Sequence, residues 1–355
     1  MAKQWGDPIE IDIDGRVVKC SNPLRPYFPE VGVTKQHIVE YYVQVAPVML
    51  RYIVNRPTTL ERWPTGVIPG VTLAQRDGTK GAAFYQKRVP TSAPDYVETC
   101  RIAFPSGRTA DEVCPTEPAV LVWLATLGTI TMHPWPVRRD DPETPDELRL
   151  DFDPQPGTDF NDAVVAALAA RDLMSEWGWI GYPKTSGGRG VHVYVRIQRR
   201  WTFTDVRHAA IAIGRELERR LPGKVTTKWW KEERGETIFV DYNQNARDRT
   251  IAAAYSVRAR TGAPVSTPVT WEQLRTIDPM TCTVKTVAER VRDLGDPWVS
   301  LDDEAFDLTP ALELYETDQS DRGLTDMPYP PEYPKMPGEP KRVQPSRARA
   351  DTDQT

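Results

Sequence analysis

The sequence lacks the features of a membrane protein and of a disulfide-stabilised secreted protein. No stretch approaches the run of about 20 apolar residues that a membrane-crossing helix needs. The polar start MAKQWGDPIEID lacks the apolar core of a signal peptide. The four cysteines, at positions 20, 100, 114 and 282, are too widely spaced to indicate a C-x-x-C zinc site or a disulfide framework. We therefore expect a cytoplasmic protein with reduced thiols and no membrane contact.

An excess of positive charge is also missing. The formal net charge is −5, which argues against a general nucleic-acid coat protein, because phosphate binding depends on a local excess of Lys and Arg. Two segments are locally basic: residues 184–200 carry five basic side chains and no acid, and residues 245–260 carry four Arg against one Asp. Solvated basic faces are common, so these segments alone do not establish a nucleic-acid site.

The chain divides into three parts. Residues 1–20 are an N-terminal extension in which IEIDIDGRVVKC predicts an edge strand pair with a hairpin turn at Asp14 and Gly15. Residues 21–301 contain most of the core-forming segments and predict the folded domain. From residue 302 the sequence becomes acidic and then rich in proline, so we expect 302–355 to be largely disordered, with one docked turn near 308–315.

Helical and strand patterns alternate within the central part. Apolar residues at helical spacing follow Thr34, a good N-cap, and two further helices are expected at 117–126 and 159–176. Alternating or apolar runs predict strands at 148–153, 190–197 and 235–242. The pattern indicates an α+β or mixed α/β fold with strands that end at polar motifs.

Two carboxylates lie on one face of a predicted strand. Asp151 and Asp153 are two residues apart in LRLDFD, and strand side chains alternate between faces, so both point the same way. Like charges this close repel unless a cation lies between them, which indicates a divalent metal site. Asp241, at the end of another apolar strand, would complete a cluster suited to phosphoryl transfer. The alternative is that the D-x-D pair caps a turn before Pro154.

A glycine-rich turn precedes a later strand. In SGGRGVH (186–192), Gly187 and Gly190 permit close backbone approach, so that N–H groups can cradle phosphate oxygens. Ser186, Arg189 and His192 would add a hydroxyl, a charge and a directed hydrogen bond. No GK[ST] follows at Walker spacing. The alternative for His192 is a hydrogen-bonded histidine on a sheet face.

These segments together resemble known catalytic motifs. LDFDP (150–154), PKTSGGRGVHVYV (183–195) and VDYNQN with YSVRAR (240–245 and 255–260) are similar to the motifs of bacterial primase-polymerases of the archaeo-eukaryotic primase superfamily. The resemblance is to the polymerase domain of ligase D and to stand-alone relatives such as Primase-Polymerase C. It implies an α+β, RRM-like catalytic core with mixed or antiparallel sheets flanked by helices. Four more segments match in order: RPTTLERWPTGV (56–67), FYQK (84–87), LVWLATLGTITMHPW (121–135) and VSTPVTWEQL (265–274).

The resemblance implies an active site. Asp151, Asp153 and Asp241 would hold two Mg²⁺ or Mn²⁺ ions, with Asp241 nearest the primer hydroxyl. NTP and dNTP would be the substrates, with ribonucleotides preferred through a polar group near the 2′ hydroxyl that the sequence does not identify. The residues expected to bind or support the nucleotide are Lys184, Ser186, Gly187, Arg189, Gly190, His192, Gln244, Asn245 and Arg258.

The resemblance also implies contacts with DNA. Arg25 and Lys35 would bind the 5′ phosphate beyond a gap; many relatives have Lys at the first position, and Arg keeps the charge but presents a fork. Lys35 follows Thr34 at a helix start, where we expect free N–H groups to favour an anion. Two exposed surface charges are the alternative. Phe84 and Tyr85 would stack on template bases, unless strand alternation buries one of them.

The segment 68–83, IPGVTLAQRDGTKGAA, is longer than the usual connection in this resemblance. It carries Arg76 and Lys80, which would contact DNA and let the loop select short gaps, although a tolerated surface insertion is the alternative. Within it, Gln75 stands where the nucleophilic Lys of a K-x-D-G ligase motif would be. We therefore expect a stand-alone polymerase without an attached sealing activity.

The function expected from these features is template-dependent filling of short DNA gaps during repair. The expected partners are gapped or primed DNA with a 5′ phosphate and nucleoside triphosphates, and we expect a monomer associated with the nucleoid. One alternative is an end-joining polymerase that acts with Ku and a separate DNA ligase. Alternatives of another class are a metal-dependent nuclease, which would not need the triphosphate-binding residues, and a non-catalytic gap binder, against which the three intact acids argue.

Overall fold

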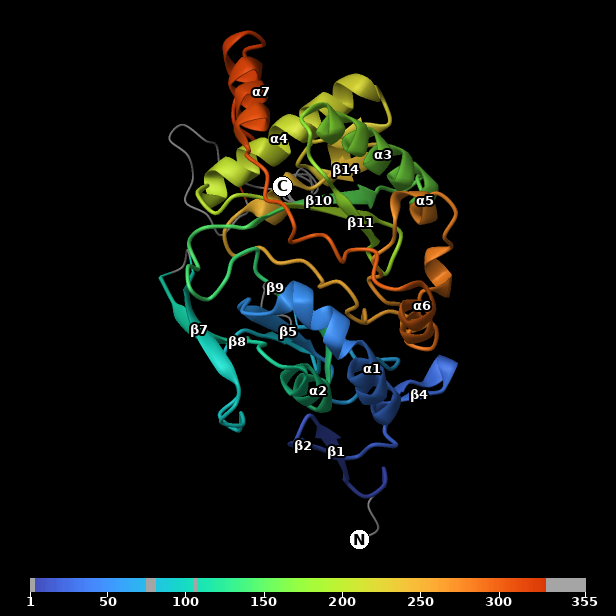
Figure 1. Cartoon of the computed structure of the whole chain (residues 1–355). Coiled ribbons are helices and arrows are strands. Elements are labelled where there is room, and N and C mark those ends of the chain that lie inside the picture. The colour runs from blue at the N-terminus through green and yellow to red at the C-terminus, as the bar shows by residue number, and fades with distance from the viewer. Residues whose placement is uncertain (1–3, 75–80, 105–106, 330–355) are drawn as a thin grey trace, which may run out of the picture.

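Two five-stranded sheets form the body of the protein, one in the lower half of Figure 1 and one in the upper half. The computed structural model describes residues 4–74, 81–104 and 107–329. Each sheet is covered by helices and has an apolar core of its own. The mixed helices and sheets confirm the α+β class.

The lower sheet follows the order β6-β5-β8-β7, and β9 also pairs with β5. All its strand pairs are antiparallel. Helices α1 and α2 pack against each other beside this sheet, and α2 is buried along almost its whole length (Figure 1). The elements are α1 (Lys35–Ile53), β5 (Thr58–Arg62), β6 (Phe84–Gln86), β7 (Glu98–Ala103), β8 (Thr109–Cys114), α2 (Pro118–Thr126) and β9 (Thr129–Pro134).

The upper sheet has the order β11-β12-β10-β14-β13, so β10 is central. Its pairs are antiparallel except β13 with β14. Helices α3 and α4 cover one face of this sheet, and α7 packs against α4 (Figure 1). The elements are β10 (Glu147–Pro154), α3 (Phe160–Glu176), β11 (Tyr182–Thr185), β12 (Val191–Arg196), α4 (Phe203–Arg220), β13 (Val225–Thr226), β14 (Ile238–Val240) and α7 (Thr309–Ser320).

Smaller elements join and flank these halves. The hairpin predicted at the N-terminus forms, with Asp14 and Gly15 both at positive φ in its turn. It is a separate two-stranded sheet near α2, so it does not extend the edge of a larger sheet. The elements are β1 (Ile9–Ile13), β2 (Arg16–Cys20), β3 (Pro26–Phe28), β4 (Val33–Thr34), α5 (Trp271–Leu274) and α6 (Val287–Leu294).

Local signals account for the predicted helices and for the central strand. The Thr34 hydroxyl accepts a hydrogen bond from the N–H of His37 at the start of α1, and the Asp159 carboxylate caps α3 in the same way. In β10, Leu150 and Phe152 are fully buried in the upper core, as the alternation predicts. Because Leu150 and Phe152 point into the core, Asp151 and Asp153 point toward the opposite face of the sheet.

The sequence left one helix unpredicted, and one expected turn was wrong. Helix α4 was not predicted, although Thr202 caps it and Asp205 completes a capping box three residues later. The expected docked turn at 308–315 is a full helix, α7, and ordered chain continues to Tyr329. The acidic composition after residue 302 concealed this helix, because one of its carboxylates, Asp318, is buried and pairs with Arg219 and Arg215 of α4.

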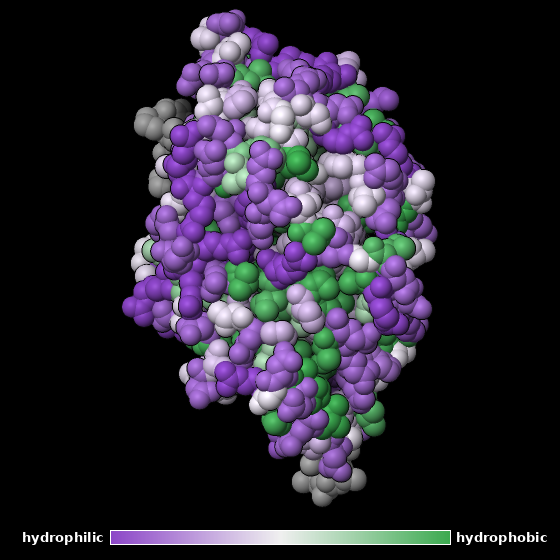
Figure 2. All heavy atoms as spheres, viewed as in Figure 1, coloured by the Kyte–Doolittle hydropathy of each residue, from purple (hydrophilic) through white to green (hydrophobic). Residues whose placement is uncertain are grey.

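The four cysteines are free and buried, as expected. Within the described residues, no helix has the length and apolar character needed to span a membrane. The face drawn in Figure 2 is mainly hydrophilic, with apolar side chains in small patches.

Candidate active site

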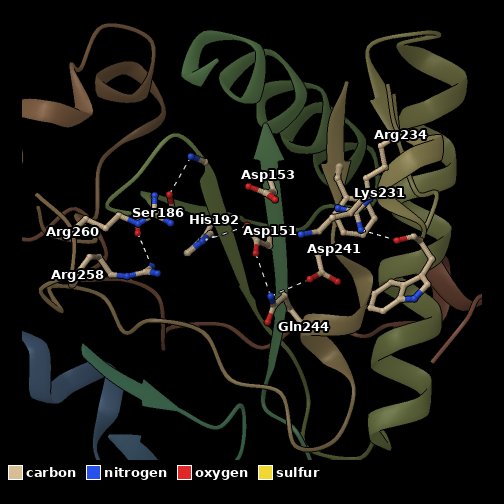
Figure 3. A pocket seen from close by; sticks show the side chains of 13 residues that line it. Asp151, Asp153, Ser186, His192, Lys231, Arg234, Asp241, Gln244, Arg258 and Arg260 are labelled. Atoms are coloured by element: carbon tan, nitrogen blue, oxygen red, sulfur yellow. Dashed lines mark hydrogen bonds and ion pairs between the residues drawn. The ribbon is translucent and has the colours of Figure 1, made fainter. Parts of the chain in front are cut away.

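Three aspartates from two strands line one cavity. Asp151 and Asp153 project from β10, and Asp241 directly follows β14, the neighbouring strand (Figure 3). The backbone N–H of Asp241 donates to the Asp151 carbonyl at 3.0 Å, which fixes the end of β14 beside β10. The cavity has a volume of about 380 Å³. The fold thus brings together acids separated by almost ninety residues of chain, as the sequence pattern predicted.

The electrostatics of these acids favour a cation. Burial, with repulsion from Asp241 and Asp153, raises the pKa of Asp151 to about 8. The pKa of Asp241 is also raised, chiefly by burial. A divalent ion would offset this repulsion, and oxygen ligands are those that Mg²⁺ and Mn²⁺ prefer.

An amide lies between two of the acids. Gln244 Nε2 donates to Asp151 Oδ2 at 3.3 Å and to Asp241 Oδ2 at 3.1 Å. In the described parts of the chain, no three Asp, Glu, His or Cys side chains form a group ready to hold a metal ion as they stand. The donor chemistry fits a divalent cation, and binding one between Asp151 and Asp241 requires the Gln244 amide to turn away.

The glycine turn is built into the wall of the cavity. Gly187 has a φ of +71°, and a Cβ on Gly190 would lie 2.8 Å from the Phe152 carbonyl oxygen, so neither position accepts a side chain without strain. The Ser186 hydroxyl accepts a hydrogen bond from the Gly190 N–H at 3.1 Å. Arg258 donates to the Ser186 carbonyl at 2.8 Å, which ties the turn to the basic side of the cavity.

His192 is held by a buried lysine. Lys184 Nζ lies 2.7 Å from His192 Nδ1 and also donates to the Ala252 carbonyl and the Ser266 hydroxyl. When Lys184 is charged it has no acceptor, so it donates to Nδ1 and the imidazole proton then resides on Nε2. That nitrogen lies 3.4 Å from Asp151 Oδ1. Burial lowers the pKa of both Lys184 and His192 well below the usual range.

The expected nucleotide-binding residues do not all face the cavity. Lys184 is fully buried behind His192, and Gly187 is buried outside the lining. Arg189 is exposed and donates to the Pro154 carbonyl at 3.4 Å, again outside the lining. The expected residues that line it are Asp151, Asp153, Ser186, Gly190, His192, Asp241, Gln244 and Arg258.

Sequence reasoning missed part of the basic wall. Arg260 also lines the cavity, as do Lys231 and Arg234 from the segment between β13 and β14 (Figure 3). Trp229 is a further lining residue. Arg260 could have been predicted from the sequence, because it lies two residues after Arg258 in YSVRAR. The other two cations lie in and directly after a single 3-10 turn, Lys231–Glu233, which is too short for periodicity to indicate which way a side chain points.

A second cationic pocket lies beside the start of α1. Arg25, Lys35 and Arg62 line a cavity of about 260 Å³ together with Asn22, and no acid is among its lining residues. Lys35 is only 6% exposed, and burial lowers its pKa. Its Nζ donates to the Ser21 carbonyl at 2.9 Å, which fixes the ammonium at the pocket wall. Two exposed surface charges, the alternative considered above, do not describe this arrangement.

The expectation of free N–H groups at this helix start was wrong. The N–H of Lys35 donates to the Arg25 carbonyl at 2.8 Å, and the next N–H, of Gln36, donates to the Pro23 carbonyl at 2.9 Å. The chain before the helix folds back over its first turn and occupies these donors. An anion in this pocket would therefore be bound by side chains.

Both members of the aromatic pair are exposed. Phe84 is 36% exposed and Tyr85 50%, so neither belongs to the core. They line a further cavity of about 680 Å³ with Lys87, His133 and seven other residues, Gln244 of the acid cavity among them. Tyr85 packs edge-on against the His133 ring at 5.6 Å. Arg76 and Lys80, the expected DNA contacts of the long loop, lie outside the described residues.

Comparisons with known proteins identify the family. A model of the primase-polymerase domain of LigD matches residues 34–298. The polymerase domain of *Mycobacterium tuberculosis* ligase D, solved in complex with DNA, superposes with a TM-score of 0.72 at 31% identity, covering 81% of this chain and 99% of that one. The chain belongs to the LigD primase-polymerase domain family. It is thus a nucleotidyltransferase of the primase-polymerase class, which uses nucleoside triphosphates and divalent metal ions.

Longer relatives of this family member are also known. The multifunctional non-homologous end joining protein LigD of *Mycolicibacterium smegmatis* is 29% identical over 320 residues, which are 90% of this chain and 40% of that protein. The LigD protein of *Pseudomonas aeruginosa* is 31% identical over 285 residues, 79% of this chain and 32% of that protein. The chain therefore spans less than half the length of these two relatives.

Proposed function

We propose that this protein fills short gaps in DNA during repair, by template-dependent addition of nucleotides to a primer 3′ end. The observation that carries the proposal is the pairing of an acid cluster with a basic wall in one cavity. Asp151, Asp153 and Asp241 form one side, and Arg258 and Arg260 stand on the other (Figure 3). A triphosphate lying between them would meet the arginines directly and the aspartates through the divalent cations that these acids would hold.

The chain's own residues would bind and orient the nucleotide. Two Mg²⁺ or Mn²⁺ ions held by the three aspartates would supply the charge that activates the primer hydroxyl and neutralises the triphosphate. Arg258 and the Ser186 hydroxyl would bind the phosphates, and the His192 Nε2 proton would be directed at a phosphate oxygen. Lys184 fixes that proton's position from behind. These groups account for catalysis by positioning and charge.

The cationic pocket of Arg25, Lys35 and Arg62 would bind the 5′ phosphate on the far side of a gap. A doubly charged phosphate gains from several donors held in place before it arrives, and Lys35 is held in this way. Phe84 and Tyr85 would stack on bases at the gap edge, where each stacked base contributes about 1–3 kcal/mol. A preference for ribonucleotides rests on the family resemblance.

One substrate distinguishes the proposed activity from its rivals. The protein is incubated with Mn²⁺, NTPs or dNTPs, and a duplex with a one-nucleotide gap, a labelled primer and a downstream 5′ phosphate. Extension of the primer by one nucleotide, faster with NTPs and faster on the gap than on an open primer end, is the expected result. Shortening of the primer would indicate a nuclease, and a mobility shift without either change would indicate a binder.

End joining is a second candidate, which the names of the longer relatives favour. In that role the protein would extend paired DNA ends together with Ku and a separate DNA ligase, as a monomer at the nucleoid. The two roles share the chemistry and differ in the DNA. Faster extension across two overhanging ends than across a gap in one duplex would favour end joining.

A further inference from the structure

A short segment after α7 returns to the active-site side of the upper half. After α7 packs along α4, residues Thr325–Tyr329, here termed the C-terminal strap, lie against α4 and the turn that follows Asp241. Arg215 of α4 donates to the Thr325 carbonyl at the beginning of the strap. The strap lies beyond residues 34–298, the part that matches the family model.

Arg207 connects the strap to the turn. Its side chain is fully buried in α4, and its Nη1 donates to Asp326 Oδ1 at 2.9 Å. Its Nη2 donates to the Met327 and Pro328 carbonyls at 2.6 and 3.1 Å, and its guanidinium lies 3.7 Å from the centre of the Tyr329 ring. The strap thus provides the carboxylate, two carbonyls and an aromatic face that compensate this buried charge.

The same guanidinium holds the turn that carries the active-site residues. Arg207 Nε donates to Asn243 Oδ1 at 2.9 Å, and Asn243 Nδ2 donates to the Pro328 carbonyl at 3.0 Å. The Asn243 backbone N–H in turn donates to Asp241 Oδ1 at 3.0 Å. The Tyr242 hydroxyl also donates to Pro328, at 3.3 Å. An unbroken series of hydrogen bonds therefore runs from the strap to the carboxylate of Asp241.

We infer that the C-terminal strap is a positioning element for the third metal-binding acid. It orients the turn Tyr242–Asn245 so that Asp241 and Gln244 face Asp151, an inference that rests on the proposed role of Asp241 in metal binding. Outer groups that orient metal-binding carboxylates typically change metal affinity or activity by about 10–100-fold when removed. The strap residues contact neither nucleotide nor DNA in this scheme, so they act through Arg207 and Asn243.

Full-length variants separate positioning from simple stability. The strap variant is Asp326→Ala with Tyr329→Ala, which removes a charge and a ring that face Arg207. The matched control is Val113→Ala, a buried residue of β8 that belongs to the lower core, so that it lowers stability by opening a cavity in the half that does not contain the strap. Asp326→Asn is the milder variant to be used if the double variant does not fold. Thermal unfolding, hydrogen exchange, Mn²⁺ requirement and steady-state kinetics are measured for each.

The strap variant is expected to increase hydrogen exchange in the peptide that covers residues 242–246 of the metal-free protein, about tenfold. Its kcat should fall about tenfold and its half-saturating Mn²⁺ concentration should rise, while the KM for NTP and the Kd for gapped DNA change less than about twofold. The control should lower the Tm and leave the exchange of this peptide and kcat unchanged.

Two results would overturn the inference. One is unchanged exchange and kcat in the strap variant, or in Asp326→Asn when that variant is used. The other is an equal change in exchange and kcat in the control, Val113→Ala. If the wild-type protein extends no primer, the proposed function fails, but the exchange measurement still decides whether the strap orders the turn.

Discussion

A single buried carboxyl group outside the candidate active site should make the stability of the protein depend on pH. Glu112, in β8, is completely buried, and one of its oxygens has no hydrogen-bond partner within the described structure. The other accepts from the Thr59 hydroxyl at 3.1 Å and from the Trp135 indole at 3.2 Å. Burial raises the pKa of Glu112 from 4.5 to about 7. The folded protein therefore favours the protonated form.

The upward shift of the Glu112 pKa determines how the stability of the protein depends on pH. Because the folded pKa is raised, the stabilisation is complete below about 4.5 and is lost as the pH rises through about 7. At about 1.4 kcal/mol per pKa unit, the loss is on the order of 3 kcal/mol. Glu112→Gln should remove this loss and raise the free energy of unfolding at pH 8, measured by urea denaturation. The exposed Glu304→Gln is the control, and a variant that keeps the wild-type pH dependence would contradict the assignment.

Residue patterns predicted the acids better than the bases. Asp151 and Asp153 were recognised because strand alternation fixes their common face, and Asp241 because it ends an apolar strand. Lys231 and Arg234 were missed because they lie in and directly after a single 3-10 turn, which is too short for periodicity to indicate their direction. Lys184 was assigned to the triphosphate, whereas its strand buries it behind His192. Whether a strand side chain faces the cavity or is buried behind another residue depends on which neighbouring strands cover it.

Among the elements, α1 and α3 were predicted from strong local signals, whereas α4 was missed despite its capping box and α7 is stabilised mainly by packing. Helices α1 and α3 have clear caps and amphipathic spacing. Helix α7 has neither a side-chain cap nor basic residues in its last turn, and it is held by Asp318, which binds Arg219 and Arg215 of α4. The sequence alone does not show that these distant charges meet.

The cationic pocket beside the start of α1 predicts that the protein prefers a gap with a 5′ phosphate over a gap with a 5′ hydroxyl. Arg25→Gln with Lys35→Gln should reduce the preference for a 5′-phosphorylated gap over a 5′-hydroxyl gap by about tenfold or more, since a hydrogen bond to a charged group is worth about 1.5–3 kcal/mol. The rate on an open primer end should not change. Primer-extension rates on the three substrates measure this, with the exposed Lys19→Gln as the matched control. An undiminished preference in the double variant would place the phosphate elsewhere.

For the whole molecule, a buried ion network joins the two halves. Arg56 precedes β5 of the lower sheet, and its guanidinium binds Asp146 at 2.6 Å and Glu147 at 2.8 Å, at the start of β10 in the upper sheet. Arg196 of β12 contacts both acids as well. These side chains are almost completely buried, so each charge depends on its partners.

Arg56→Met should destabilise the protein strongly, because it leaves Asp146 and Glu147 buried with less compensating charge. Removing one partner of a buried pair typically costs about 3–5 kcal/mol. The control is Arg101→Met, which breaks an exposed pair with Asp111 and should change stability little. Urea denaturation of both variants tests this, and equal losses would show that the network does not hold the halves together.

The most direct test of the central claim is primer extension by the wild-type protein and by Asp153→Asn on the same gapped, 5′-phosphorylated duplex with Mn²⁺ and NTPs. Asp172→Asn, an exposed acid of α3, is the matched control. One-nucleotide extension is expected from the wild type and the control. Asp153→Asn should extend the primer only at background while it keeps its affinity for DNA. Extension by Asp153→Asn at the wild-type rate would contradict the proposed role of the three aspartates.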